Sequence, residues 1–165
     1  MIEDVKVAAA EQAPLNVVSK VQRHVVLKWT PTLESWVKLN TDGSYSVDED
    51  CAACGGVPRD HHGNFLLGFT MKVGVCSILH AELWGLVHGL RFVLGRGFSK
   101  ILIEADSAGT IEFLNKGCPV VHPCFPLVRE FHHLVGQNCY IHWKHVYREV
   151  NFVADSFAKN GLRIL

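Results

Sequence analysis

The sequence predicts an α/β fold in which a five-stranded mixed sheet, with three antiparallel strands and then parallel crossovers, is flanked by about four helices. Apolar and polar residues alternate over the segment that begins at Trp36, which is typical of strands. A long segment after residue 78 repeats its apolar residues with the 3.6-residue period of a helix. Shorter strand-like and helix-like segments then follow one another, which indicates crossovers rather than a simple meander.

Length and composition fit one domain that is preceded by a tail. The chain has 165 residues, of which 48% are hydrophobic, enough for a sizeable core. Residues 1–34 show no sustained period, so we interpret them as an N-terminal tail or linker and residues 35–165 as the domain. Trp29 and Pro31 are expected to lie against the start of this domain.

The first three strands are expected to form antiparallel pairs. Residues 36–45 place Val37, Leu39 and Thr41 on one face of a strand. Residues 52–59 and 65–73 have strand character and are separated by residues 60–64, a hairpin turn with Gly63 at its tip.

The second half of the chain alternates helices with short strands. The main helix is expected over residues 79–96, with Glu82 in its first turn and Gly95 and Gly97 at its end. Its glycines Gly85 and Gly89 would let its backbone lie close to a sheet. The remaining elements are a buried strand at 100–105, a helix from Asp106 or Ser107 to 116, a helix at 123–135, a strand at 140–146 and a helix at 151–159.

Charge and cysteine content narrow the functional classes. The 16 basic and 16 acidic residues cancel, so nucleic acid would have to bind through a local patch. The acidic start of the chain lacks the apolar region of a secretory signal, so we expect an intracellular protein with reduced thiols, without distinguishing nucleus from cytoplasm. A zinc site at Cys51-x-x-Cys54 would need a second ligand pair at matching spacing, and Cys54 also fits an apolar strand position. No apolar run reaches the roughly 18 residues of a membrane span.

Four acidic residues are the main functional signal: Asp42, Glu82, Asp106 and Asp155. Several lie in or beside apolar segments, where an isolated carboxylate is costly to bury. The predicted elements would direct all four towards one point, where their charges would repel one another. Two Mg²⁺ ions about 3.5–4 Å apart would relieve this repulsion and support an in-line displacement at phosphorus, with Mn²⁺ as a possible substitute.

Each acid taken alone also has a structural interpretation. Asp42 before Gly43 is compatible with a turn, and Asp106 is compatible with a helix cap. Glu82 could be an acid favoured by the helix dipole, and Asp155 could lie on a solvated helix face. The metal site therefore depends on the four acids occurring together.

The local contexts of these acids resemble those of a known family. The segments are Thr41-Asp42-Gly43-Ser44, Ala81-Glu82-Leu83, Asp106-Ser107 and Asn151-x-x-x-Asp155. In this order they resemble the type 1 ribonuclease H family, and more narrowly the ribonuclease H-like domain of plant non-LTR retroelement reverse transcriptases and their standalone relatives. The resemblance covers about Trp36 to Leu162.

This resemblance implies an enzyme that hydrolyses the RNA strand of RNA–DNA hybrids and leaves 5′-phosphate and 3′-hydroxyl ends. We also expect a monomer, and a domain that descends from a larger reverse transcriptase polyprotein. Asp42, Glu82, Asp106 and Asp155 would be the metal ligands, and His145 would move protons or assist product release. The substrate would be contacted by a further set of residues, namely Gly43, Ser44, Ser77, Ser107 and Asn151.

The chain departs from the bacterial members of this family in two ways. Their amide side chains before the helix glutamate read RNA 2′-hydroxyls, whereas Ile78 and Leu79 cannot, so backbone groups, Ser44, Ser77 or His80 would have to serve. The bacterial basic handle is also missing, so affinity from phosphate contacts should be modest and salt-sensitive. Two alternatives follow, a nucleic-acid-binding module with little or no turnover and a protein-interaction scaffold.

Overall fold

The computed structural model describes residues 27–137 and 139–164. Within them the elements are β1 Val37–Ser46, β2 Cys51–Arg59, β3 Phe69–Gly74, α1 Ile78–Gly95, β4 Lys100–Ala105, α2 Ala108–Lys116, α3 Phe125–Val135, β5 Tyr140–His145, the 3₁₀ helix η1 Arg148–Val150 and α4 Phe152–Gly161. The strands lie in the order β3-β2-β1-β4-β5. β1, β2 and β3 pair antiparallel, whereas β4 is parallel to both β1 and β5. The predicted mixed α/β fold is confirmed.

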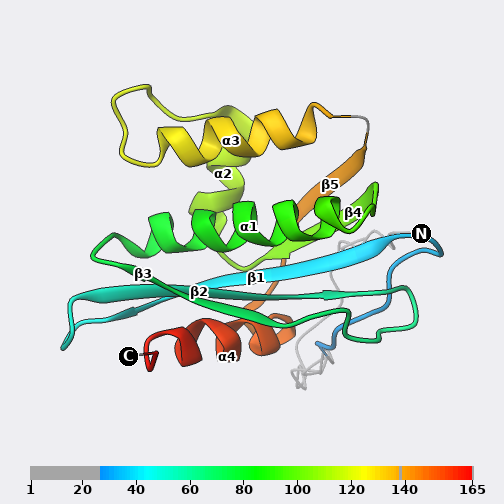
Figure 1. The fold of residues 1–165 in the computed structure, drawn as a ribbon, viewed down its shortest axis with the longest axis horizontal. Helices are drawn as coiled ribbons and strands as arrows, with labels where there is room; N and C mark the ends of the chain where they lie inside the picture. The colour runs from blue at the N-terminus through cyan, green and yellow to red at the C-terminus, as the bar shows by residue number, and fades with distance from the viewer. Residues whose placement is uncertain (1–26, 138, 165) are drawn as a thin grey trace, which may run out of the picture.

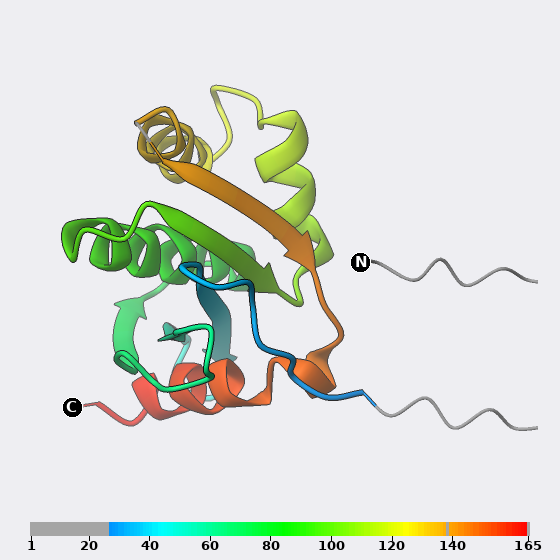
Figure 2. The ribbon, with the colours of Figure 1, turned by 90° about the vertical axis from the view of Figure 1, so that its right-hand side faces the viewer.

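The helices lie on the two faces of the sheet in unequal numbers. Figure 1 shows α1, α2 and α3 on one side of the sheet and α4 on the other, and Figure 2 shows the same layers from the end. The main apolar core lies on the three-helix side, where Leu39 and Ile103 of the sheet meet Leu86 of α1 and Phe131 of α3. The apolar period of α1 thus buries one helix face against the sheet.

Glycines let the helices approach the sheet at backbone distance. A Cβ atom on Gly85 would lie 3.1 Å from Cβ of Cys54, and one on Gly89 would lie 3.0 Å from a Leu39 methyl. The expectation that these two glycines allow close approach of α1 is therefore confirmed. On the other face, Gly55 of β2 lies against the backbone of Phe157 and Ala158 in α4.

Several predicted boundaries need correction. The third strand begins at Phe69 rather than at residue 65, because Phe65 forms only an isolated bridge with Arg59 before the chain bends. Helix α1 begins at Ile78 with Ser77 as its N-cap, so Glu82 lies in the second turn rather than the first. Helix α3 begins at Phe125. Helix α4 begins at Phe152, after η1.

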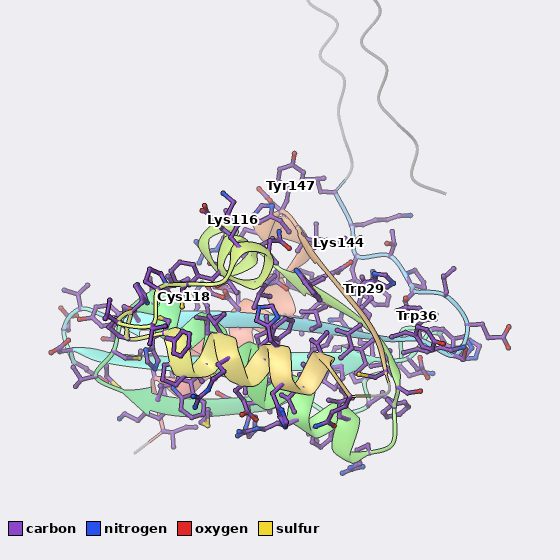
Figure 3. The ribbon with its side chains drawn as sticks, turned by 90° about the horizontal axis from the view of Figure 1, so that it is seen from above. Trp29, Trp36, Lys116, Cys118, Lys144 and Tyr147 are labelled. Carbon is purple, nitrogen blue, oxygen red and sulfur yellow. The ribbon has the colours of Figure 1, made fainter. Side chains whose placement is uncertain are left out.

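Residues 27–34, which we call the strap, lie against the sheet on the side of α4. The Trp29 indole donates to Asn40 Oδ1 at 3.0 Å, and its ring lies 5.1 Å from Lys38 Nζ and 4.7 Å from the Arg59 guanidinium carbon. The Lys38 ammonium donates to the carbonyl of Thr30 at 2.7 Å. The predicted contact of Trp29 with the start of the domain is confirmed, and Figure 3 labels Trp29 near Lys144 in the view from above.

Two further expectations concern cysteines and membranes. Cys54 is fully buried in β2, as its interpretation as an apolar strand residue requires. In the described ranges all six cysteines are unbonded, and the one group of side chains able to hold a metal contains no cysteine. The described helices include none with the length and apolar character to cross a bilayer.

We expect Gly55→Ala to destabilise the protein by about 2–3 kcal/mol, because the added methyl overlaps the α4 backbone and has no space to relax into. The matched control is Gly95→Ala at the end of α1, where a Cβ meets nothing within 4 Å and helix propensity favours alanine by up to about 1 kcal/mol. Urea denaturation of the three proteins measures both effects. Equal stability of Gly55→Ala and the wild type would contradict this packing.

Candidate active site

Two of the predicted acids come together because β1 and β4 are parallel and in register. The last register pair is Thr41 with Ala105, so Asp42 and Asp106 occupy the next position on each chain. At this point β4 has ended while β1 continues to Ser46. The carboxyl groups therefore meet where the sheet opens, at the carboxyl end of a parallel strand pair.

The third acid reaches this point because α1 crosses β1 at a glycine. A Cβ atom on Gly43 would lie 2.7 Å from the backbone nitrogen of Glu82, so any larger residue would push the helix away. This close approach places Glu82 beside Asp42. Gly43, predicted as a substrate contact, thus has a packing role that sets the position of a neighbouring carboxylate.

Asp42, Glu82 and Asp106 form one acidic cluster. Each offers a carboxylate oxygen, and the three oxygens lie within 4.8 Å of one another. Asp42 is 2% exposed and Glu82 is 7% exposed, and one oxygen of each, Oδ2 and Oε2, is buried without a hydrogen-bond partner. Buried carboxylate oxygens without donors are costly unless a cation binds them. The donor set therefore fits a hard divalent ion such as Mg²⁺.

Without a cation, the carboxyl groups of Asp42 and Glu82 hold protons more tightly than ordinary carboxyl groups. Burial raises the pKa of Asp42 to about 7, and the negative charges of Asp106 and Asp155 act in the same direction. Burial raises the pKa of Glu82 to about 9, with the charges of Asp42 and Asp106 adding to the effect. Because a metal binds the ionised carboxylates, it has to displace these protons.

Asp155 lies next to the cluster but is bound by cations of the chain itself. Its Oδ2 lies 2.6 Å from Lys159 Nζ, and its Oδ1 lies 3.3 Å from Nη2 of Arg148. The same guanidinium approaches Asp106, with Nε 3.9 Å from Oδ2. Partial burial alone would raise the pKa of Asp155, but the hydrogen bond and charge of Lys159, with the charge of Arg148, hold that pKa below its usual value.

His145 ends β5 at the edge of the cluster. Its Nε2 lies 3.1 Å from the backbone carbonyl oxygen of Asp106, and the side chain is exposed. Because a carbonyl oxygen only accepts, Nε2 carries the hydrogen in this contact and Nδ1 is left as the acceptor nitrogen. The imidazole therefore touches the backbone of a predicted metal ligand without binding its carboxylate.

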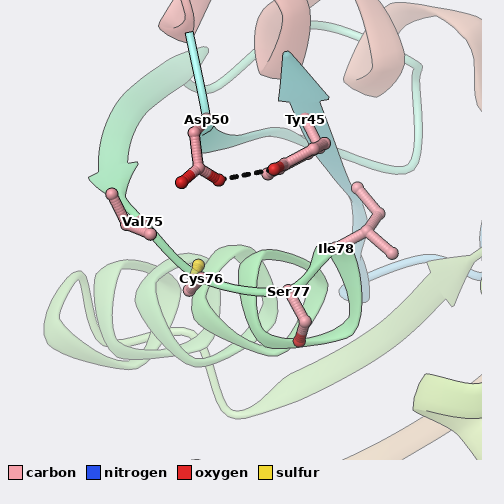
Figure 4. A pocket seen from close by; sticks show the side chains of 6 residues that line it. All are labelled: Tyr45, Asp50, Val75, Cys76, Ser77 and Ile78. Atoms are coloured by element: carbon pink, nitrogen blue, oxygen red, sulfur yellow. Dashed lines mark hydrogen bonds between the residues drawn. The ribbon is translucent and has the colours of Figure 1, made fainter. Parts of the chain in front are cut away.

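The predicted serine contacts lie in different environments. Ser107 caps α2 by accepting from the Thr110 amide, and Ser77 caps α1 by accepting from the His80 amide. Ser77 also lines an open pocket of about 430 Å³ between the end of β1 and the start of α1, with Tyr45, Asp50, Val75, Cys76 and Ile78. Figure 4 shows Tyr45 pointing at Asp50 in this pocket. Ser44 is half-buried on β1.

Asn151 lies behind the acidic cluster rather than on its surface. It is 1% exposed, and its Nδ2 donates to the Thr41 carbonyl at 2.9 Å and to Asp106 Oδ1 at 3.1 Å. It also stands at the N-cap of α4 but its side chain caps no amide. A direct substrate contact, which we predicted for Asn151, does not fit this burial, and the structure gives it contact with a candidate ligand.

A family model described as reverse transcriptase-like matches residues 40–161. The chain belongs to the reverse transcriptase-like family. The chain is 37% identical over 133 residues to an Arabidopsis thaliana protein named Putative ribonuclease H protein. This match covers 81% of this chain and 22% of that protein. The chain thus spans less than a quarter of the length of that relative.

Solved structures show the same fold. The N-terminal ribonuclease H domain of a Mycobacterium tuberculosis protein matches with a TM-score of 0.71 at 24% identity, over 78% of this chain and 94% of that one. Ribonuclease H1 from the archaeon Halobacterium salinarum matches with a TM-score of 0.68 at 25% identity, over 78% of this chain and 98% of that one. The resemblance to ribonuclease H stated from the motifs is confirmed.

The sequence reasoning assigned no role at this site to four residues. Arg148 and Lys159 were not identified, although Lys159 stands four residues after Asp155, a spacing that pairs charges on a helix. Asn40, which supports Asn151 from behind, was also given no role, and Trp29 was expected only to pack against the start of the domain. Asn40 lies on the face of β1 opposite the apolar residues. Because such a polar face is usually exposed, the sequence pattern did not indicate that Asn40 is buried.

We expect the metal-free protein to lose stability as the pH rises from about 5 to 8.5. The folded state keeps protons on Asp42 and Glu82 above the pH at which the unfolded chain releases them. Because the folded state then binds more protons than the unfolded state, the free energy of unfolding falls as the pH rises. Asp42→Asn removes one ionisable group and should flatten this dependence. Urea denaturation in chelator across this range measures the slope, and added Mg²⁺ should restore wild-type stability most at high pH. Parallel slopes for the two proteins would contradict the assignment.

Proposed function

We propose that the protein is a metal-dependent endonuclease that hydrolyses the RNA strand of RNA–DNA hybrids. The observation that carries this proposal is the convergence of three carboxyl groups, two of them with buried unpartnered oxygens, at the end of a parallel strand pair. The names of the Arabidopsis, mycobacterial and archaeal relatives, all ribonuclease H, support the substrate class.

The chain's own residues divide the work of the site. Asp42, Glu82 and Asp106 would hold divalent ions, with Asp155 as a further ligand on the side of Arg148. When bound, two such ions activate a water molecule and stabilise the leaving oxygen of a phosphodiester. The protein keeps the ligands in place through the in-register strands, the Gly43 approach and the Asn151 amide.

His145 supplies a proton-transfer group outside the ligand set. With Nε2 donating to the Asp106 carbonyl, Nδ1 is free to accept a proton. An imidazole is suited to this role near neutral pH. Its exposure also leaves it accessible to a nucleic acid that covers the site.

Substrate binding should be weak and salt-dependent. The chain has no net charge, and Ile78, which is 46% exposed, presents a methyl surface at the start of α1. Asp50 adds a negative charge to the pocket beside Ser77, although it accepts a hydrogen bond from Tyr45 at 2.6 Å. Weak capture of the hybrid would lower turnover, so the second candidate is a nucleic-acid-binding module with little or no turnover, and a cleavage assay separates the two.

Purified protein should cut a labelled RNA–DNA hybrid in Mg²⁺, and Asp106→Asn should lower the rate at least about a hundredfold because a metal ligand loses its charge. Asp48→Asn, an exposed acid in the turn after β1, is the matched control and should cut like the wild type. Hybrid binding without cleavage in both Mg²⁺ and Mn²⁺ would favour the binding module. Equal cutting by wild type and Asp106→Asn would reveal a contaminating nuclease.

His145→Ala should lower kcat about a hundredfold, the usual contribution of a positioned proton-transfer group. Its affinity for Mg²⁺ in calorimetry should stay at the wild-type value, because the imidazole contacts a backbone carbonyl and not a ligand carboxylate. His133→Ala, on the exposed face of α3, controls for loss of any surface histidine. An unchanged kcat in His145→Ala would exclude the histidine from the chemical step.

A further inference from the structure

Three side-chain hydrogen bonds connect the strap to the acidic cluster. The Trp29 indole donates to Asn40 Oδ1 at 3.0 Å, and Asn40 Nδ2 donates to Asn151 Oδ1 at 3.1 Å. Asn151 Nδ2 then donates to Asp106 Oδ1 at 3.1 Å. Both asparagines are 1% exposed, so water cannot replace these bonds easily.

The orientations of the Asn40 and Asn151 side-chain amides are determined by their hydrogen-bond partners. An indole N–H only donates, so Asn40 must present its oxygen to Trp29 and its amino group to the other side. That amino group serves Glu104 Oε2 at 3.1 Å as well as Asn151, which agrees with the same orientation. Asn151 must then present its own oxygen to Asn40 and its amino group to Asp106. All donors therefore run in one direction and end on a carboxylate.

Charged residues around the strap hold Trp29, the first donor in this series of hydrogen bonds, in place. Glu104 is 2% exposed and pairs with Lys38 Nζ at 2.8 Å and with Lys144 Nζ at 3.3 Å. The Arg59 guanidinium stacks between the rings of Trp29 and Phe65, 4.7 Å from each centroid. Bonds in series polarise one another in a buried environment, so a change at Trp29 is transmitted towards Asp106.

We infer that Trp29 is a positioning residue for the metal-binding carboxylates, and that the strap is a working part of the active site although it lies before the segment matched by the family model. This inference rests on the proposed function, because it concerns the same carboxylates. Trp29 acts through Asn40 and Asn151 and touches neither metal nor substrate.

The test compares wild type with Trp29→Phe, which keeps an aromatic ring over Lys38 and Arg59 but removes the N–H donor. Trp36→Phe is the matched control, since Trp36 is also half-buried, stacks on His142 at 5.4 Å and makes none of the three hydrogen bonds that link Trp29 to Asp106. Isothermal calorimetry with Mg²⁺ and with Mn²⁺ should show about three- to tenfold weaker binding for Trp29→Phe only. This is below the loss for a direct ligand partner because two amides intervene.

A second measurement follows the indole N–H resonances of the wild type during Mg²⁺ titration. The Trp29 resonance should shift with the midpoint found by calorimetry, and the Trp36 resonance should not, an effect that a purely structural role would not produce. This readout needs no variant to fold. Wild-type calorimetry without any Mg²⁺ binding would overturn the proposed function and this inference with it. Normal Mg²⁺ binding by the wild type with an unmoved Trp29 resonance, or with wild-type affinity in Trp29→Phe, would overturn this inference alone.

Discussion

The burial of like-charged carboxyl groups is the constraint on which the rest of the site depends. Asp42 and Asp106 are neighbours because their strands are parallel and in register, and Glu82 joins them because Gly43 lets α1 touch β1. Such an arrangement is unfavourable for folding unless protons or cations neutralise it. The fold therefore keeps an electrostatically costly centre where a loosely packed surface would let the acids move apart.

The neutralisation of this centre is uneven. Asp42 and Glu82 keep buried unpartnered oxygens, whereas Asp155 is already bound by Lys159 and Arg148. Asp106 lies between these two environments, with one oxygen accepting from Asn151 and the other facing Arg148. Asp42 and Glu82 thus depend on an external cation more strongly than Asp155 does, and Asp106 is intermediate.

Local patterns were sufficient for the order of the elements, because alternation and helical periodicity are properties of adjacent residues. They were also sufficient to single out Asp42 and Asp106, since each follows or interrupts an apolar strand in a recognisable context. They were insufficient for Asn40 and Trp29, whose importance comes from a contact between the strap and the sheet. Burial of Lys38 was equally invisible, because its partner Glu104 lies 66 residues away on another strand.

The segment matched by the family model begins later in the chain than the folded domain does. The matched segment starts at residue 40, inside β1, which itself begins at Val37. A truncated recombinant form that started there would lack the ammonium of Lys38 and leave the buried Glu104 with Lys144 as its remaining cation among these contacts. An expression trial that trimmed this protein to the shared segment would thus remove part of what neutralises its interior.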